Sequence, residues 1–160
     1  MVTYSYAYNG PTDKIARAMG KALPISMRAS MEICRYLRQK PLNRAKQILN
    51  DAINMKKPIP FKRFTEGAGH QSGFGPAKYP IKACAKILEL LESAEANAHN
   101  KGLSKDLKIA HIITQKAPKA FHYGRQIRRK MKRTHLEVVL AEYVPVQKKT
   151  KNKPAKSEEK

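Results

Sequence analysis

The sequence contains no tryptophan and only two cysteines, and it has no apolar run long enough to span a bilayer. A membrane span needs about 20 consecutive apolar residues, and tryptophan is a usual anchor at the membrane surface. We therefore expect no membrane association. Cys34 and Cys84 lie far apart in segments of helical pattern, and neither has another cysteine or a histidine at metal-ligand spacing. We predict two buried free thiols, no metal site and no cofactor.

Acidic residues are also scarce, with 12 Asp and Glu against 33 Lys and Arg, and the net charge is +21. Such an excess opposes folding by self-repulsion unless a polyanion neutralises it, so the predicted partner is a nucleic acid. Charge alone fits a DNA-compacting protein as well as an RNA-binding one. The few acids form no catalytic pair, because Glu89, Glu92 and Glu95 follow Lys82 and Lys86 at helical spacing and are explained by ion pairing on a helix face. We predict no catalytic residues.

A length of 160 residues is typical of one domain. The expected division is a polar leader over residues 1–12, a single RNA-binding domain over 13–146 and a Lys-rich tail over 147–160 that is disordered when free. Residues 1–10 carry three tyrosines and no basic residue before an apolar run, which is unlike a secretory or transit signal. The predicted location is the cytoplasm.

Three segments have the apolar spacing of helices. The first covers residues 27–39 behind Ser26, a good N-cap, and the second runs from Pro41 to about residue 55. The third begins at Pro80 and ends at Asn100 and Gly102. Residues 13–23 fit either a helix or an edge strand. Residues 57–79 are predicted to be a surface loop, because glycine and proline interrupt any long element and the P-loop pattern is absent.

Two later runs alternate with the period of strands. Leu107, Ile109, His111 and Ile113 share one face of the first run. The second run shows the same alternation over residues 136–140. Together they predict two strands joined by the segment between them.

The segment between these strands, residues 116–133, is named the basic arm here; it contains eight basic residues and no acid, with three aromatic side chains at its centre. Phosphate contacts supply most nucleic-acid affinity, and aromatic rings stack on unpaired bases. The alternative is a basic helix whose charges face solvent, since Arg125, Arg128, Arg129 and Lys132 also have helical spacing. The predicted RNA-binding residues are Lys116, Lys119, His122, Tyr123, Arg125, Arg128, Arg129, Lys130, Lys132 and Arg133 in the arm, with Arg28, Arg38, Lys40, Lys62 and Arg63 outside it.

The sequence resembles one family over about residues 26–142: the universal large-subunit ribosomal protein known in bacteria as L twenty-two and in eukaryotes as L seventeen. The long glycine-bearing loop, the leader and the tail are similar to its archaeal and eukaryotic branch. The residues that carry the resemblance are Leu37, Arg38, Gln39, Lys40, Ala45, Ile48, Leu49, Glu92, Ser93, Ala94, Ala96, Asn97, Ala98, Leu107, Ile109, Gly124, Arg125, Lys132, Arg133, Thr134, His135, Val138 and Val139.

The resemblance implies an α+β fold, with three helices on a small three-stranded antiparallel sheet. From that sheet a long basic β-hairpin protrudes, over about residues 108–140. The resemblance implies that residues 14–23 form a sheet strand. It also implies that large-subunit rRNA, neighbouring ribosomal proteins and the nascent polypeptide are the partners. By the same resemblance the hairpin tip faces the peptide exit tunnel. The residues at that tip are Phe121, His122, Tyr123, Gly124 and Arg125, where the family usually has Arg-Ala, one further residue and Gly-Arg.

Overall fold

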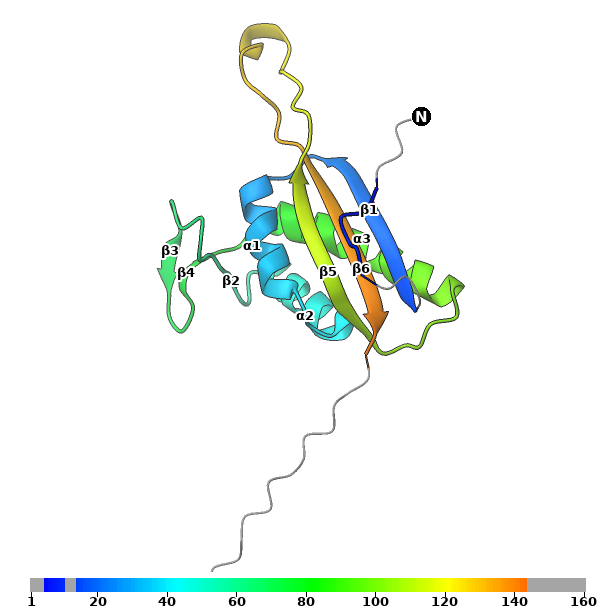
Figure 1. Ribbon diagram of the computed structural model, residues 1–160. Helices are drawn as coiled ribbons and strands as arrows, with labels where there is room; N and C mark the ends of the chain where they lie inside the picture. The colour runs from blue at the N-terminus through cyan, green and yellow to red at the C-terminus, as the bar shows by residue number, and fades with distance from the viewer. Residues whose placement is uncertain (1–4, 11–13, 144–160) are drawn as a thin grey trace, which may run out of the picture.

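The main sheet is built around β6 (Thr134–Glu142), which pairs antiparallel with β1 (Ile15–Leu23) on one side and β5 (Leu107–Lys116) on the other. The structure is a computed structural model that describes residues 5–10 and 14–143. Three helices cover one face of this sheet, and the basic arm extends from one end of it (Figure 1). This is the predicted α+β architecture. The predicted tail lies outside the described residues.

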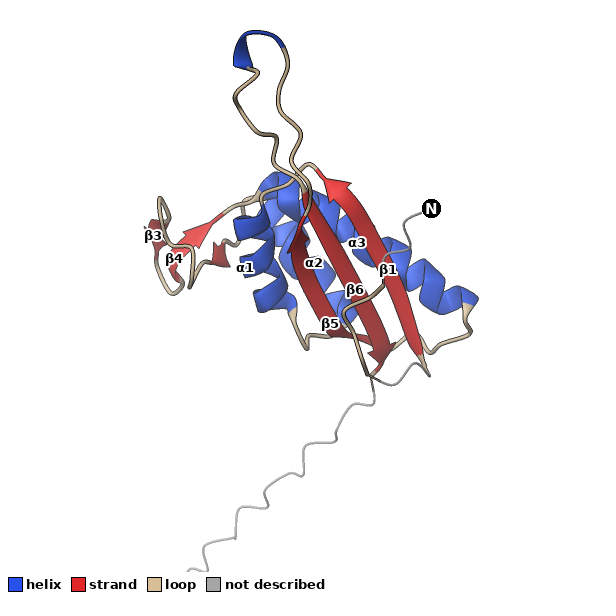
Figure 2. Ribbon diagram, turned by 45° about the horizontal axis from the view of Figure 1, so that its top comes forward, coloured by secondary structure: helices blue, strands red, loops and turns tan. Residues whose placement is uncertain are grey.

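The helices are α1 (Met27–Leu37), α2 (Leu42–Ile53) and α3 (Ile81–Asn100), close to the predicted ranges. Figure 2 shows them on the same side of the strands, where α1 packs on β5 and α3 on β1 and β6. Their apolar stripes meet the inner face of the sheet in one core, which includes Ile33, Leu91 and other side chains with no more than 9% exposure. The sequence-predicted stripes are therefore the packing surfaces.

The end of α3 shows why glycine stops this helix. Gly102 has a φ of 70°, a left-handed conformation that costs glycine little. Its N–H donates to the carbonyl of His99, and the N–H of Leu103 donates to the carbonyl of Ala98. These two bonds form a Schellman motif, which satisfies the last carbonyls of the helix and turns the chain toward β5.

Residues 15–23 form a strand at the edge of the sheet, as the family resemblance implied; of the two alternatives left open by the sequence, the edge strand is confirmed and the helix is wrong. Ile15 pairs with Ala141, and the ladder continues to Gly20 opposite Leu136. A bulge precedes Leu23, where Ala22 has a φ of 50°. Pairing with a central strand and burial against α3 outweigh a weak helix propensity.

The predicted alternation of β5 is wrong beyond Ile109. The ladder has an irregularity between Ile109 and His111, which inserts one residue and reverses the facing of everything after it. Ile112 and Thr114 therefore face the core, with 0% and 7% exposure, while His111 and Ile113 lie on the outer face and are half-buried. A bulge leaves no signature in a pattern of apolar residues, so simple alternation misassigns these side chains.

Residues 57–79 contain a second small antiparallel sheet that the loop prediction missed. Its strands are β2 (Ile59–Pro60), β3 (Gly69–Gln71) and β4 (Gly75–Lys78), with β4 in the centre. They are too short to show periodicity among so many glycines and prolines. The small sheet projects beside α1, away from the main sheet (Figure 1).

The outer face of the main sheet is covered in part by residues 5–10, within the expected polar leader. The Ala7 N–H donates to Glu137, 2.9 Å away, whose other oxygen accepts a 3.1 Å bond from Gln115. The Arg17 guanidinium lies over the ring of Tyr6, 5.4 Å from its centre. The pKa of Tyr6 is raised, because burial and the charge of Glu137 outweigh the lowering effect of Arg17. The leader thus supplies partners for a glutamate that is only 1% exposed. The division of the chain into a leader over residues 1–12 and a domain over 13–146 remains a prediction.

Candidate nucleic-acid interface

The basic arm begins where the β5–β6 ladder ends, at the pair Lys116 and Thr134. Beyond it three backbone hydrogen bonds cross between the two sides, from Ala117 to Arg133, Met131 to Ala120 and His122 to Arg129, and Phe121 bridges Lys130. Regular strand pairing therefore stops short of the predicted hairpin length. Proline at position 118 has no N–H to donate, and repulsion among like charges opposes close pairing. The arm is an irregular hairpin.

A short 3₁₀ turn, η1 (Gly124–Gln126), closes the arm at its far end (Figure 1). Gly124 has a φ of 68°, which favours glycine at this turn. The structure thus places Gly124 and Arg125 at the tip, as predicted. It also excludes the alternative of a basic helix, because no α-helix covers residues 116–133.

Most side chains of the arm point into solvent. All residues from 118 to 130 are exposed, and Tyr123 reaches 88%. Lys130 lies 5.2 Å above the ring of Phe121, and Arg129 donates to Gln126 at 3.2 Å. Among the described residues no arm cation has a carboxylate within 4.0 Å. The structure therefore gathers the ten predicted arm residues into one uncompensated positive surface.

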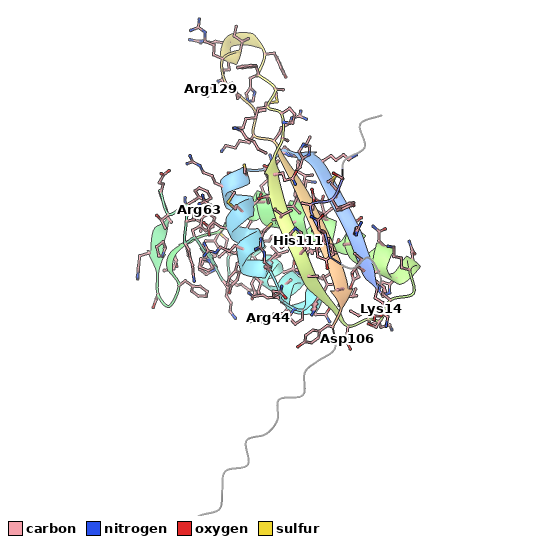
Figure 3. All side chains as sticks on the ribbon, viewed as in Figure 1. Lys14, Arg44, Arg63, Asp106, His111 and Arg129 are labelled. Carbon is pink, nitrogen blue, oxygen red and sulfur yellow. The ribbon has the colours of Figure 1, made fainter. Side chains whose placement is uncertain are left out.

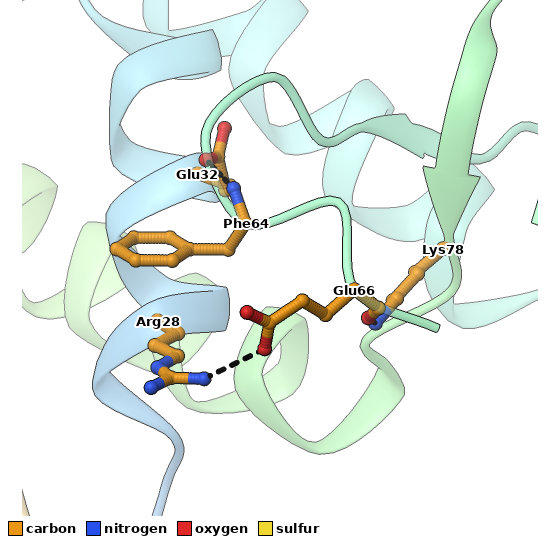
Figure 4. A network of polar contacts seen from close by, with 5 residues as sticks. All are labelled: Arg28, Glu32, Phe64, Glu66 and Lys78. Carbon is orange, nitrogen blue, oxygen red and sulfur yellow. Dashed lines mark hydrogen bonds and ion pairs between the residues drawn. The ribbon is translucent and has the colours of Figure 1, made fainter. Parts of the chain in front are cut away.

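Arg28 is held differently, in the contact network of Figure 4. It donates to Glu66 at 3.2 Å and lies 5.7 Å from the ring of Phe64. Lys78 donates to the backbone carbonyl of Glu66 at 2.6 Å. The charge of Arg28 is thus partly compensated by an exposed ion pair, unlike the charges of the arm.

Glu32 fixes the loop that carries Lys62 and Arg63. Its carboxylate is 2% exposed and accepts the backbone N–H groups of Lys62, Arg63 and Phe64 at 3.1, 2.8 and 3.0 Å. Burial raises the Glu32 pKa, but these three bonds and the charge of Arg35 lower it more, so the net pKa is below its ordinary value. The buried carboxylate positions two exposed cations beside α1.

Arg38 and Lys40 follow at the end of α1. Arg38 donates to the carbonyl of Ile112 on β5 at 3.4 Å and remains exposed. Lys40 donates to the carbonyl of Tyr36 and lies 4.3 Å from its ring. Burial, and then the charge of Arg44, lower the pKa of Lys40. Arg38 thus faces the same side of the protein as Arg63, whereas Lys40 is engaged by its own helix.

Sequence reasoning missed Arg35. This exposed residue lies one helical turn from Glu32 and lines the same hollows as Arg38, Arg63 and Lys62. Nothing in the local pattern distinguishes it from any solvent-facing arginine. Only the contact between α1 and the distant loop brings these side chains together; Figure 3 shows Arg63 beside α1.

Neither a metal site nor a membrane-spanning helix is found among the described residues. Both cysteines are buried and free, as predicted. Burial raises the pKa of each thiol to about 12, although Arg38 lowers that of Cys34 in part. Thiols this difficult to ionise are poor nucleophiles.

Comparison with known proteins identifies the family to which this basic surface belongs. Residues 18–141 match the sequence profile of the family described as ribosomal protein L22p/L17e. The chain is 41% identical over 151 residues to the large ribosomal subunit protein uL22 of Methanosphaera stadtmanae, covering 88% of this chain and 96% of that one. It is 39% identical over 152 residues to the uL22 of Archaeoglobus fulgidus, covering 87% and 96%.

A third archaeal relative is the large ribosomal subunit protein uL22 of Methanocaldococcus jannaschii, with 38% identity over 142 residues, or 82% of this chain and 90% of the relative. The match thus runs through the body, the basic arm and the final strand. Such identity over nearly the whole length of three relatives confirms the resemblance seen in the sequence. The chain belongs to the ribosomal protein L22p/L17e family.

Proposed function

We propose that this chain is a structural, non-enzymatic component of the large subunit of the cytoplasmic ribosome, and that its basic arm binds and stabilises rRNA. One observation carries the mode of binding: residues 116–133 hold eight cations and no acid, and seven of these cations are exposed while Arg133 is half-buried. Phosphate contacts by such cations supply most of the affinity for RNA. Family membership favours this function over DNA compaction.

The geometry of the arm supports a division of labour along it. Lys116, Lys132 and Arg133 lie at its base, next to the main sheet, where phosphates of packed rRNA can reach both the arm and the body. Phe121, His122 and Tyr123 lie near the tip and offer rings to unpaired bases or to a polypeptide. We propose that the tip lines the nascent-peptide tunnel and that the body also contacts neighbouring ribosomal proteins.

Cryo-electron microscopy of large subunits purified from cells that carry this chain tests the proposal. We expect residues 116–133 to be enclosed by rRNA, with the Gly124 turn at the wall of the tunnel. A map that shows the arm in bulk solvent overturns the role proposed for it. Absence of the chain from large subunits after a high-salt wash overturns the ribosomal role.

An arm replacement measures the same role in solution. Exchanging residues 118–132 for Asn-Gly, a turn suited to a two-residue hairpin, removes six of the eight cations and leaves Lys116 and Arg133. We expect the dissociation constant for a transcript of archaeal large-subunit rRNA to rise about 100-fold or more in 150 mM salt, since such affinity scales steeply with phosphate contacts. Filter binding measures it.

The control changes Lys56, Lys57 and Lys105 to Gln, three exposed cations of the body, which is half the number that the arm replacement removes. Its loss of log affinity per cation removed is expected to be far smaller than that of the arm replacement. Both variants keep the main sheet and the core, so circular dichroism is expected to show nearly unchanged melting. An equal loss of log affinity per cation removed in the two variants indicates a general charge effect and contradicts a specific role of the arm.

A further inference from the structure

A groove runs along the exposed face of α1, between the edge of β5 and the loop before β3. It consists of two adjoining hollows that share Glu32 and Arg35. The first is also lined by Tyr36, Lys40, Pro60 and Lys62, and the second by Met31, Cys34, Arg38, Arg63, Ile112, Ile113 and Thr114. We call this feature the α1 groove.

Four exposed cations of the α1 groove make no close ion pair, although Arg35 acts on the Glu32 carboxylate from a longer distance. Within the described part of the chain, no carboxylate lies within 4.0 Å of Arg35, Arg38, Lys62 or Arg63. The one acid in the lining, Glu32, already accepts three backbone N–H groups. The groove therefore keeps a net positive charge at a fixed position, which is what an anionic ligand requires.

The floor of the α1 groove is suited to more than a free ion. Met31 and Ile113 are half-buried and add apolar surface to the lining. Arg38 donates to the outward carbonyl of Ile112, so the alternation of the strand turns the backbone of Thr114 to the same free edge. A ligand here meets guanidinium groups on its rim, apolar atoms beneath it and backbone polar groups at its side.

We propose that the α1 groove binds a single-stranded segment of rRNA, with phosphates held by Arg35, Arg38 and Arg63 and a ribose or base resting on Met31 and Ile113. Planar guanidinium groups match the oxygen geometry of phosphate and can bond it in pairs. This inference rests on the proposed function and adds a second binding site on the opposite side of β5 from β6.

The position of the groove favours RNA over an acidic peptide. β5 leads from Thr114 to Lys116, the first cation of the basic arm, over about 7 Å at the usual rise of a strand. The groove cations and the arm cations therefore form one track beside a single strand. A polyanion of regularly spaced phosphates can follow such a track, whereas an acidic peptide has no need of the arm.

A triple variant in the full-length chain, Arg35→Gln, Arg38→Gln and Arg63→Gln, tests the proposal. The probe is a transcript of the large-subunit rRNA of Methanosphaera stadtmanae, titrated by filter binding from 100 to 400 mM potassium chloride. We expect the dissociation constant to rise about tenfold or more. The slope of log affinity against log salt is expected to fall by about 2, since each phosphate contact to a single strand contributes about 0.7.

Two further variants serve as controls. Lys56→Gln, Lys57→Gln and Lys105→Gln remove the same charge from exposed sites outside the groove. Arg35→Lys, Arg38→Lys and Arg63→Lys keep the charge and lose the planar fork, so their affinity should lie between wild type and the Gln variant. Crosslinking of wild type to a transcript containing 4-thiouridine should mark a peptide from residues 27–38. Thermal melting verifies that each variant is folded.

The outcomes separate the groove from the arm. Equal affinity and salt slope in the groove variant and the lysine control overturn the groove proposal, while loss of binding in the arm replacement still supports the proposed function. A wild-type chain that binds duplex DNA as tightly as the rRNA transcript overturns the proposed function itself. A groove variant that keeps full RNA affinity but loses binding to an acidic ribosomal protein shows that the groove takes a peptide and overturns the RNA assignment.

Discussion

The basic arm and the α1 groove expose the same kind of charge, but the protein holds them in opposite ways. In the arm, three backbone hydrogen bonds and one bridge connect two irregular segments whose side chains face solvent. In the groove, a buried carboxylate, a helix and a paired strand fix the cations from beneath. The arm extends farther from the body, and the groove is more nearly prearranged.

This difference indicates which free-energy terms limit each site. An isolated two-stranded ribbon is marginal in water, so the RNA binding proposed for the arm would cost conformational entropy as the arm becomes ordered. The groove has already lost most of that entropy in folding, and binding there costs less ordering. We infer that the arm contributes reach and phosphate number, whereas the groove contributes a defined register on the RNA.

Thiol reactivity gives the largest expected contrast between the packed body and the arm. A pKa of about 12 leaves only about one thiol in 10⁴ ionised at pH 8, so Cys34 and Cys84 should react with a disulfide reagent only through opening of the fold. A cysteine introduced by Ile127→Cys lies on the exposed arm and should react roughly a thousandfold faster. Mass spectrometry of the modified peptides measures both rates.

The control is the same reaction in 8 M urea, where all three thiols should be modified at similar rates. Should Cys84 react in the native protein as fast as the introduced thiol, the packing of α3 against the sheet is not as tight as its burial indicates. Protection of the introduced thiol, on the other hand, indicates that the arm folds back on the body in solution.

A pair of alanine substitutions compares the two regions by stability. Leu91→Ala removes a fully buried side chain of α3 and is expected to lower the free energy of unfolding by about 2–5 kcal/mol. Ile127→Ala acts on a side chain that is 59% exposed in the arm, so its effect is expected to stay within about 0.5 kcal/mol. Urea unfolding followed by circular dichroism measures both. A large effect of Ile127→Ala contradicts the view of the arm as energetically separate from the core.

Much of the fold was predictable because its signals are local. The helices have apolar stripes, and each cysteine lies in the stripe of its own helix, Cys34 in α1 and Cys84 in α3. Pro41 marks the start of α2, and Gly102 follows the end of α3. The arm was predictable because eight cations without an acid are visible in composition alone. By contrast, the bulge after Ile109 depends on how β5 meets β6, and no pattern within β5 reveals it.

The α1 groove was not predictable because its parts are distant in the sequence. Glu32 and Arg63 are separated by 31 positions, and Arg38 reaches Ile112 over 74. Lys62 and Arg63 were predicted from charge, but their placement depends on a buried acid whose role emerges only when the loop folds onto α1. Arg35 shows the same limit, since an exposed arginine on a helix is common and becomes informative only through its neighbours.

The smallest of the contrasts tests whether Glu32 prearranges the groove. Glu32→Gln keeps one oxygen acceptor but turns an amide N–H₂ toward backbone donors, so we expect the free energy of unfolding at pH 7 to fall by about 1–3 kcal/mol. The folded-state pKa of Glu32 is lowered, so its contribution is present above the ordinary value of 4.5 and is lost as pH falls through the folded pKa.

The difference between wild type and Glu32→Gln should therefore shrink in urea unfolding at pH 3 relative to pH 7. Glu92→Gln, at an exposed position of α3, is the matched control and should change little at either pH. A difference that stays constant with pH indicates that shape and not charge holds the loop. Because Glu32 positions Arg63 through a backbone bond, the same variant should weaken RNA binding at the groove even though it makes the protein more positive, an effect that bulk electrostatics predicts with the opposite sign.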